Sequence, residues 1–376
     1  MKLIWSCFAL AVRAFAVAKG PTGDIYGETL RERDRDRGLM GRRTPRHWWR
    51  LLAPEVALSV WGAVLGCGGG ATGPSPLTFA RVSAGDVHTC DVTNAGAAYC
   101  WGANFFGQLG NGTTTNSMTP VAVSGGLTFA AVSAGNYHTC VVTTAGAAYC
   151  WGDNGFGQLG NLSHATSTTP VTVSGGLTFA TVSAGFAHTC GVTTAGAAYC
   201  WGSNGTGQLG KGGDTTTSTT PVAVSGGLTF AAVSAGGYHT CAVTTAGAAY
   251  CWGVNHEGEL GNGTTTTSTT PAAVSGGLTF AAVSAGGSYT CAVTTAGAAY
   301  CWGYNGAGEI GNGTGNTSTT PAAVSGGLTF AAVSAGSNHT CGITTARAAY
   351  CWGNNSFGQL GNGTEGTSSV PVRVAQ

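Results

Sequence analysis

The chain has 376 residues, of which 65 are Gly, and only 8% are charged. This composition excludes a charged disordered tail and does not suit a helical bundle. Residues 1–55 hold 11 of the 15 Lys and Arg and 6 of the 14 Asp and Glu, which leaves 4 basic and 8 acidic residues, a net charge of −4, for the remainder. A remainder without a basic patch argues against nucleic-acid binding.

The first segment, residues 1–39, shows no core-forming pattern. It includes the charge run "TLRERDRDRG" over residues 29–38 and an apolar stretch interrupted by Arg13. We therefore expect residues 1–39 to be a non-native or disordered extension, with translation starting at Met40.

Residues 40–67 have the pattern of an export signal. Arginines precede a ten-residue apolar run, Val56–Leu65, which is too short to span a bilayer and typical of a signal peptide. Val64-Leu65-Gly66-Cys67 then resembles a bacterial lipoprotein cleavage box, which implies lipidation of Cys67. An ordinary signal peptide with an unrelated Cys is the alternative. Residues 68–78 are rich in Gly and Pro and are expected to form a tether.

The rest of the chain, residues 79–376, repeats with a period of about 50 residues. Each unit reads F-x-x-V-S-A-G-x-x-H-T-C, then a turn, then A-Y-C-W-G-x-N-x-x-G-[QE]-[LI]-G, and closes on a Ser/Thr/Gly loop with a Pro. The units are residues 79–128, 129–178, 179–229, 230–279, 280–329 and 330–376.

Each unit contains four short β-type segments separated by Gly, Asn or Pro. In the second unit we expect strands over Phe129–Ser133, His138–Thr143, Ala147–Trp151 and Val171–Val173. Four short strands per unit predict an all-β propeller of four-stranded antiparallel blades. A β-solenoid is the alternative, although its coils are usually shorter.

The combination of G-x-x-H-T with W-G-x-N-x-x-G-Q-L-G resembles the regulator of chromosome condensation repeat. The resemblance covers residues 74–376 and all six units. It implies a β-propeller, usually of seven blades, that acts through protein contacts. Six units leave three arrangements: a ring of six, an open ring, or a ring with a seventh blade of different sequence.

A pair of cysteines flanks the turn Thr143–Ala147. If Gly146 adopts a left-handed conformation in a three-residue hairpin loop, Val142 faces Ala148, Val141 faces Tyr149, and Cys140 faces Cys150. Cys140 and Cys150 would then be a non-hydrogen-bonded pair with Cα atoms ~4.5 Å apart, which a disulfide can bridge.

We therefore predict six disulfides, conditional on export. The alternatives are free buried thiols and a metal site. Spaced thiolates without a C-x₂₋₄-C knuckle argue against metal. The pairs are Cys90–Cys100, Cys140–Cys150, Cys190–Cys200, Cys241–Cys251, Cys291–Cys301 and Cys341–Cys351.

The loops after S-A-G and after C-W-G must lie on one face, because successive strands run in opposite directions. These loops vary between units far more than those of the other face. Rigid aromatic side chains on variable loops indicate a partner-binding surface, while packing between blades is the alternative. The candidate residues are Phe105, Phe106, Tyr137, Asp153, Phe156, Phe186, Tyr238, His256, Glu257, Tyr304, Asn338 and Phe357.

Other recurring residues are interpreted as structural. One His per unit (Tyr289 in the fifth) could suggest a metal site, but residues at the same position in different blades lie too far apart to share an ion. One Trp per unit fits packing between blades. No carboxylates converge beyond the remote pair Asp153 and Glu257.

We therefore expect no metal, no cofactor and no catalytic residue. We expect a monomeric, exported, lipid-anchored scaffold that binds a protein or glycan. The alternatives are a guanine-nucleotide exchange factor, as the resemblance implies, and a cell-envelope hydrolase or lyase with a channel site.

Overall fold

The computed structural model describes residues 77–375, which form 24 strands. The predicted leader and extension, including Cys67, lie outside the described residues. Blades 1 to 3 comprise β1 (Phe79–Ala84), β2 (His88–Thr93), β3 (Ala98–Gly102), β4 (Ser117–Ala122); β5 (Phe129–Ala134), β6 (His138–Thr143), β7 (Ala148–Gly152), β8 (Ser167–Thr172); β9 (Phe179–Ala184), β10 (His188–Thr193), β11 (Ala198–Gly202), β12 (Ser218–Ala223). Blades 4 to 6 comprise β13 (Phe230–Ala235), β14 (His239–Thr244), β15 (Ala249–Gly253), β16 (Ser268–Ala273); β17 (Phe280–Ala285), β18 (Tyr289–Thr294), β19 (Ala299–Gly303), β20 (Ser318–Ala323); β21 (Phe330–Ala335), β22 (His339–Thr344), β23 (Ala349–Gly353), β24 (Ser368–Arg373).

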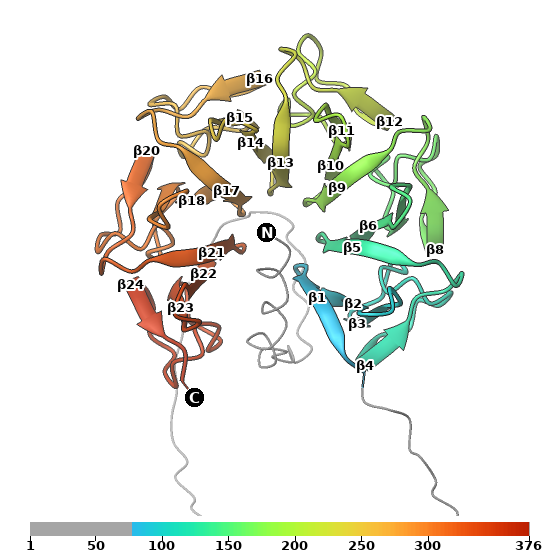
Figure 1. Ribbon diagram of the computed structural model, residues 1–376, viewed down its shortest axis with the longest axis horizontal. Helices are drawn as coiled ribbons and strands as arrows, with labels where there is room; N and C mark the ends of the chain where they lie inside the picture. The colour runs from blue at the N-terminus through green and yellow to red at the C-terminus, as the bar shows by residue number, and fades with distance from the viewer. Residues whose placement is uncertain (1–76, 376) are drawn as a thin grey trace, which may run out of the picture. The chain divides into compact units, whose positions relative to one another are not determined.

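Each blade is a four-stranded antiparallel sheet with its strands in chain order, and the blades follow one another around a centre with the fourth strands at the rim (Figure 1). The predicted six-bladed propeller is confirmed. Among the described residues, no helix is long and apolar enough to cross a membrane. The outer strand differs from expectation: β8 begins at Ser167 and passes through Pro170, because the proline lies on the sheet edge, where no ladder hydrogen bond is lost. The third strand is displaced by one residue, to Ala148–Gly152.

The predicted hairpin register is confirmed. Val142 pairs with Ala148, Val141 with Tyr149, and Cys140 with Cys150. Gly146 has a φ of +84°, as the three-residue loop requires, and its N–H donates to the Thr143 carbonyl at 2.9 Å. The structure contains all six predicted disulfides, with Cα–Cα distances of 4.0–4.1 Å.

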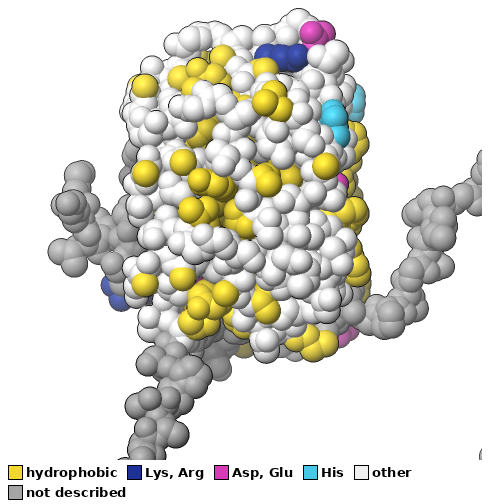
Figure 2. Space-filling model, turned by 90° about the vertical axis from the view of Figure 1, so that its right-hand side faces the viewer, with side chains coloured by type: hydrophobic (Ala, Val, Ile, Leu, Met, Phe, Trp, Pro, Cys, Tyr) yellow, Lys and Arg dark blue, Asp and Glu magenta, His cyan; other side chains and the backbone are white. Residues whose placement is uncertain are grey.

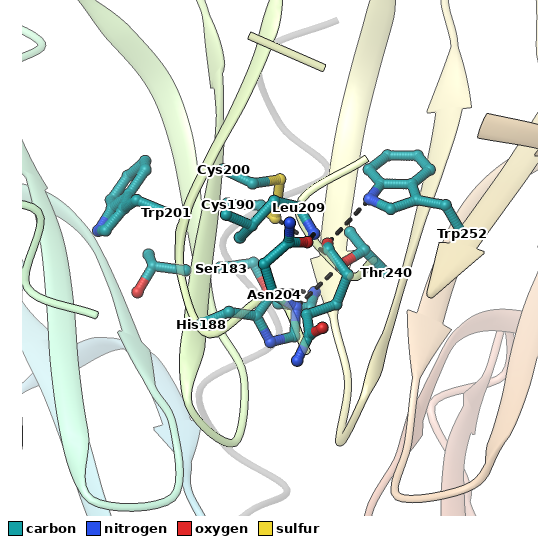
Figure 3. The surroundings of a disulfide bond; sticks show 12 residues. Ser183, His188, Cys190, Cys200, Trp201, Asn204, Leu209, Thr240 and Trp252 are labelled. Atoms are coloured by element: carbon teal, nitrogen blue, oxygen red, sulfur yellow. Dashed lines mark hydrogen bonds between the residues drawn. A yellow bond between two sulfur atoms is a disulfide. The ribbon is translucent and has the colours of Figure 1, made fainter. Parts of the chain in front are cut away.

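Five junctions join consecutive blades; four share one hydrogen-bond pattern, Tyr289 replaces the His in the fifth, and Figure 3 shows the junction between blades 3 and 4. Between blades 3 and 4, the indole N–H of Trp252 donates to the Gln208 carbonyl at 2.9 Å, and the Thr240 hydroxyl donates to the same carbonyl at 2.8 Å. The Thr240 oxygen lies 2.9 Å from His188 Nε2. Because the single Thr hydrogen is already donated, His188 must supply the proton at Nε2.

Each junction also encloses an apolar core. In the junction between blades 3 and 4, Cys190, Cys200 and Leu209 of one blade pack with Phe230 and Trp252 of the next. Equivalent clusters lie at the other four junctions. The Trp side chains are therefore packed between blades, as expected, and no side of a junction Trp is open to solvent: the five are 0% exposed.

Blades 6 and 1 lie on either side of an opening in the ring (Figure 1) and do not form a sixth junction of this kind. Trp101 and Thr89 are partly exposed, whereas their equivalents in the other five blades are fully buried. Among residues 77–375, the hydrogen bond between the two blades is the one that Ser337 Oγ donates to Asp86 Oδ1 at 2.9 Å. We call this unclosed boundary the seam; the ring formed by residues 77–375 is open.

The seam has a cavity along the wall of blade 6. The cavity has a volume of about 730 Å³ and is lined by Gly358, Gly361, Gly363, Thr364, Glu365 and Ala375. At an internal junction this space is filled: a Cβ on Gly107 would meet Thr168 of the next blade at 2.7 Å, while a Cβ on Gly358 would meet nothing within 4 Å. The wall of blade 6 therefore lacks its neighbour.

Candidate functional site

The variable loops form one face of the propeller, as strand direction predicts. In blade 2 the two loops are tied together by the Asp153 N–H, which donates to the Tyr137 carbonyl at 2.8 Å. We call this surface the aromatic face and define it by its eight aromatic side chains: Phe105, Phe106, Tyr137, Phe156, Phe186, Tyr238, Tyr304 and Phe357. Seven of the eight are exposed and Tyr137 is half-buried.

Two aromatic pairs bridge neighbouring blades on this face. The rings of Phe106 and Tyr137 are 5.1 Å apart, and those of Phe186 and Tyr238 are 5.5 Å apart. Both distances suit attractive ring contacts. Packing between blades therefore accounts for part of the burial of these four residues, but each pair still presents apolar surface to solvent. Phe105 and Phe357 are 66% and 64% exposed and have no such ring partner among the described residues.

The loops after C-W-G, which hold five of these aromatics, are fixed by one buried Asn in each unit. Asn104 Oδ1 accepts from the Leu109 N–H at 2.9 Å, and its Nδ2 donates to the carbonyls of Thr113 and Thr115 at 2.9 and 3.0 Å. The equivalent Asn in every blade is also buried and bonded to its own loop. Sequence reasoning noted this invariant Asn but missed its role; its recurrence beside a variable loop was the available signal.

The Gln of the G-Q-L-G motif has two structural roles that sequence reasoning also missed. In blade 1, Gln108 Oε1 accepts from the Phe106 N–H at 2.9 Å, so it orients an aromatic residue of the face. Its carbonyl accepts from Trp151 and Thr139 of blade 2. One residue thus couples the loops of the aromatic face to the blade junction.

Two of these positions carry Glu instead. Glu259 and Glu309 are buried, and burial raises the pKa of both carboxyls. Glu309 Oε2 accepts from the Ala307 N–H at 2.9 Å, while its other oxygen has no hydrogen-bond partner. A buried carboxyl with one unsatisfied oxygen favours the neutral form.

The polar candidates do not come together. Asp153 accepts from Gln158 Nε2 at 2.8 Å within its own loop. His256, Glu257 and Asn338 lie in loops of blades 4 and 6, with His256 and Asn338 exposed. Within residues 77–375 no group of three or more His, Cys, Asp or Glu could hold a metal ion.

Four of the five recurring histidines are buried within the junctions, and His339 of blade 6 is partly exposed. Burial lowers the pKa of His138 and His188 to about 3 and that of His88 and His239 to about 4. Nδ1 of each has no hydrogen-bond partner, which fits a neutral ring bound through Nε2. In blade 5, Tyr289 takes this position and its hydroxyl donates to the His339 carbonyl at 2.6 Å.

The propeller surface carries few charges. Figure 2, which shows the side of blades 1 to 3, has Lys, Arg, Asp and Glu only in scattered places on this part of the rim. One of the four basic residues, Lys211, is paired with Asp214 at 2.6 Å. The described surface thus offers no basic patch for phosphate groups.

The family model of the RCC1-like domain matches residues 57–376. The chain belongs to the RCC1-like domain family. A search of curated protein sequences gives no significant match.

Solved structures share the RCC1-like fold of this chain. Human WBSCR16 has a TM-score of 0.74 at 21% identity, over 80% of this chain and 82% of that one. Prp20p from Saccharomyces cerevisiae has a TM-score of 0.71 at 21% identity, over 79% and 77%. The ectodomain of the receptor kinase CR4 from Physcomitrella patens has a TM-score of 0.51 at 23% identity, over 74% and 63%. At these identities the likeness concerns the fold alone.

Proposed function

We propose that this RCC1-like protein is an exported interaction scaffold, lipid-anchored through Cys67, that binds a protein or glycan partner through the aromatic face. One observation carries the proposal. In a chain of near-identical units, the exposed aromatic residues gather on one face and differ from blade to blade. Exposed aromatic groups held on fixed loops are the side chains that most often dominate binding energy.

A protein partner agrees with the family. Prp20p binds Gsp1p and histones, so a propeller of this fold can present a protein-binding surface. A basic partner such as a histone is not expected here, because this propeller carries only a small net negative charge. We instead expect an apolar contact centred on the ring pairs Phe106–Tyr137 and Phe186–Tyr238.

Site-specific photo-crosslinking tests the face and captures the partner. A benzophenone amino acid at position 105 should yield one defined adduct in the native host, while the same group at Thr144, in the exposed turn of the opposite face, should not. Equal adducts from both positions, or none from position 105, would contradict the proposal.

The identified partner then allows a quantitative test. The triple variant Phe105→Ala, Phe186→Ala and Tyr238→Ala should weaken binding at least ~100-fold, because each hot-spot aromatic contributes ~2 kcal/mol or more. The matched control carries Thr144→Ala, Thr194→Ala and Thr245→Ala in exposed turns of the opposite face and should bind normally. Unchanged affinity of the aromatic variant would exclude this face.

The proposed export is supported by the six disulfides, because such bonds persist in oxidising surroundings outside the cytosol. Lipidation is tested separately by labelling cells with a fatty-acid analogue. We expect label on the wild-type protein and a shift to the soluble fraction for Cys67→Ser. If the wild-type protein is absent from the membrane fraction and its Cys67 is intact and unlabelled, the lipid anchor is wrong. The proposal for the aromatic face would not be affected by that result.

Binding rather than catalysis is favoured by where the carboxylates lie. Glu259 and Glu309 are buried at junctions, and Asp153 is bonded within its own loop. Acid–base chemistry needs groups that converge on one substrate position, and these residues belong to three different blades.

Nucleotide exchange on a small GTPase is the second candidate, and the similarity to Prp20p favours it. It is tested by the release of a fluorescent GDP analogue from a small GTPase. We expect no acceleration by this protein. Catalytic acceleration at substoichiometric protein would overturn the scaffold proposal in favour of the exchange factor.

A further inference from the structure

One of the six disulfides differs from the others in its surroundings. Ten cysteines, those of the first five bridges, are 0% exposed. The sixth bridge, Cys341–Cys351, lies on the wall of blade 6 that faces the seam; Cys341 is partly exposed and Cys351 is 3% exposed.

The next blade covers each of the first five bridges. In blade 5, Cys291 Sγ lies 3.7 Å from Thr340 Oγ1 of blade 6, and the indole of Trp352 packs in the same cluster. The four preceding bridges have equivalent Thr contacts at 3.6–3.8 Å. No described residue supplies such a contact to Cys341, because blade 1 does not pack against it.

The position beside Cys341 is also open. Ser334 pairs with Cys341 across β21 and β22, so both side chains lie on the same face of the sheet. Ser334 is exposed, whereas its equivalent Ser284 accepts a hydrogen bond from the Ala335 N–H of the next blade. The cavity of about 730 Å³ along this wall is lined by Gly361, whose equivalent Gly311 packs against the Trp352 indole. The wall beside Cys341 thus lacks the side chains with which the next blade covers the other five bridges.

We propose that the Cys341–Cys351 bridge is a site of reversible thiol–disulfide exchange with a low-molecular-weight thiol of the glutathione type. The thiolate attacks Cys341 Sγ and forms a new S–S bond. The bond between the two cysteine sulfurs breaks, its electron pair leaves on Cys351 Sγ, and that thiolate takes a proton from water. One disulfide is consumed and one is formed, so the step needs no further oxidant or reductant.

Exposure decides which sulfur is attacked. Cys341 is the more accessible of the two, and the neighbouring Ser334 is small. The mixed disulfide therefore forms on Cys341, and Cys351 becomes the buried free thiol, placed to reverse the reaction by attacking the new bond. The first five bridges lack this route, because a thiol reaches them only when a junction opens.

The test uses the full-length oxidised protein with reduced glutathione under native conditions, followed by acid quenching, alkylation and peptide mass mapping. We expect glutathione on Cys341 and alkylated Cys351 at a rate at least ~100-fold above that of any other bridge. Six equal rates, or a sixth bridge as slow as the rest, would overturn the proposal. Glutathione on Cys351 with alkylated Cys341 would overturn the assignment of the attacked sulfur.

A cover variant separates access from general loosening of blade 6. Ser334→Trp places a large side chain beside Cys341, and we expect exchange at this bridge to slow at least ~10-fold while the other five rates stay unchanged. An unchanged rate at Cys341 in this variant, with the other five bridges still protected, would show that local opening of blade 6 governs the reaction, which contradicts the proposal.

Discussion

The internal junctions and the seam are built from the same residues in two different environments. At an internal junction, Trp151 is fully buried and its indole N–H donates to the Gln108 carbonyl at 2.8 Å. At the seam, Trp101 occupies the same place in its unit but is partly exposed, because no blade within residues 77–375 packs against that side. The motif therefore does not determine the environment; the presence of a neighbouring blade does.

This difference follows from how a propeller is stabilised. Each blade buries its apolar face only against the next one, so stability is approximately a sum of blade and junction contributions. Five junctions hold six blades, and the outward walls of the first and last blades are left unpaired. The seam is thus where the surface is most reactive and where substitutions should matter least.

The largest expected effect compares the same substitution in the two environments. Trp201→Ala should lower the free energy of unfolding by about 3–5 kcal/mol, because it leaves a cavity at a junction. Trp101→Ala should lower it by no more than about 1–2 kcal/mol, because the side chain is only partly buried. Urea unfolding of both variants with intact disulfides measures the difference. Equal losses would show that the seam is closed in solution.

Acid should act on the junctions more than on the seam. The pKa of His188 is about 3 in the folded protein and near 6.5 in the unfolded chain, so the unfolded chain binds the proton first. The contribution of each such His to the free energy of unfolding is fully present above pH 6.5. It is lost as the pH drops from 6.5 towards 3, by about 1.4 kcal/mol per pH unit.

A natural replacement provides the control for this pH dependence. His188→Tyr copies the residue that blade 5 carries at Tyr289 and should remove about one such increment between pH 6.5 and pH 5. Unfolding free energies at pH 7, 6 and 5 give the slope. A slope identical to that of the wild type would show that His188 is not buried in its neutral form.

The smallest expected effect concerns the hairpin of blade 6. Arg347 has a φ of +64° at the position where the other five hairpins carry Gly. Arg347→Gly should stabilise the protein by about 1 kcal/mol, because Gly adopts this conformation without a steric penalty. The change makes the turn of blade 6 like the others, so any property of the seam that persists in the variant arises from the missing neighbour. A lower melting temperature of the Arg347→Gly variant would contradict the predicted stabilisation.

The sequence predicted the parts of this structure that depend on local periodicity. The six units, the four strands of each and the pairing of Cys140 with Cys150 follow from repeat length and from counting outward from a Gly turn. The start of β8 was wrong because a proline in the Thr-rich segment was taken as a boundary, whereas an edge strand tolerates it.

The seam was not predictable in the same way. Units 1 and 6 carry the same Trp, Thr and Cys as the others, so their residues do not reveal which walls stay uncovered. Closure depends on the rotation from each blade to the next, which is set by packing across the junctions rather than by any one motif. The binding role of the aromatic face remains a prediction, since the placement of Phe105 or Tyr238 says where they could bind but not what.

Hydroxyl-radical footprinting of the native protein, with peptide mass mapping, tests the open ring most directly. The six repeat tryptophans are chemically equivalent probes. We predict rapid oxidation of Trp101 and strong protection of Trp151, Trp201, Trp252, Trp302 and Trp352. Protection of Trp101 equal to that of the other five would show that a blade covers this wall, and the account of the seam and its accessible disulfide would be wrong.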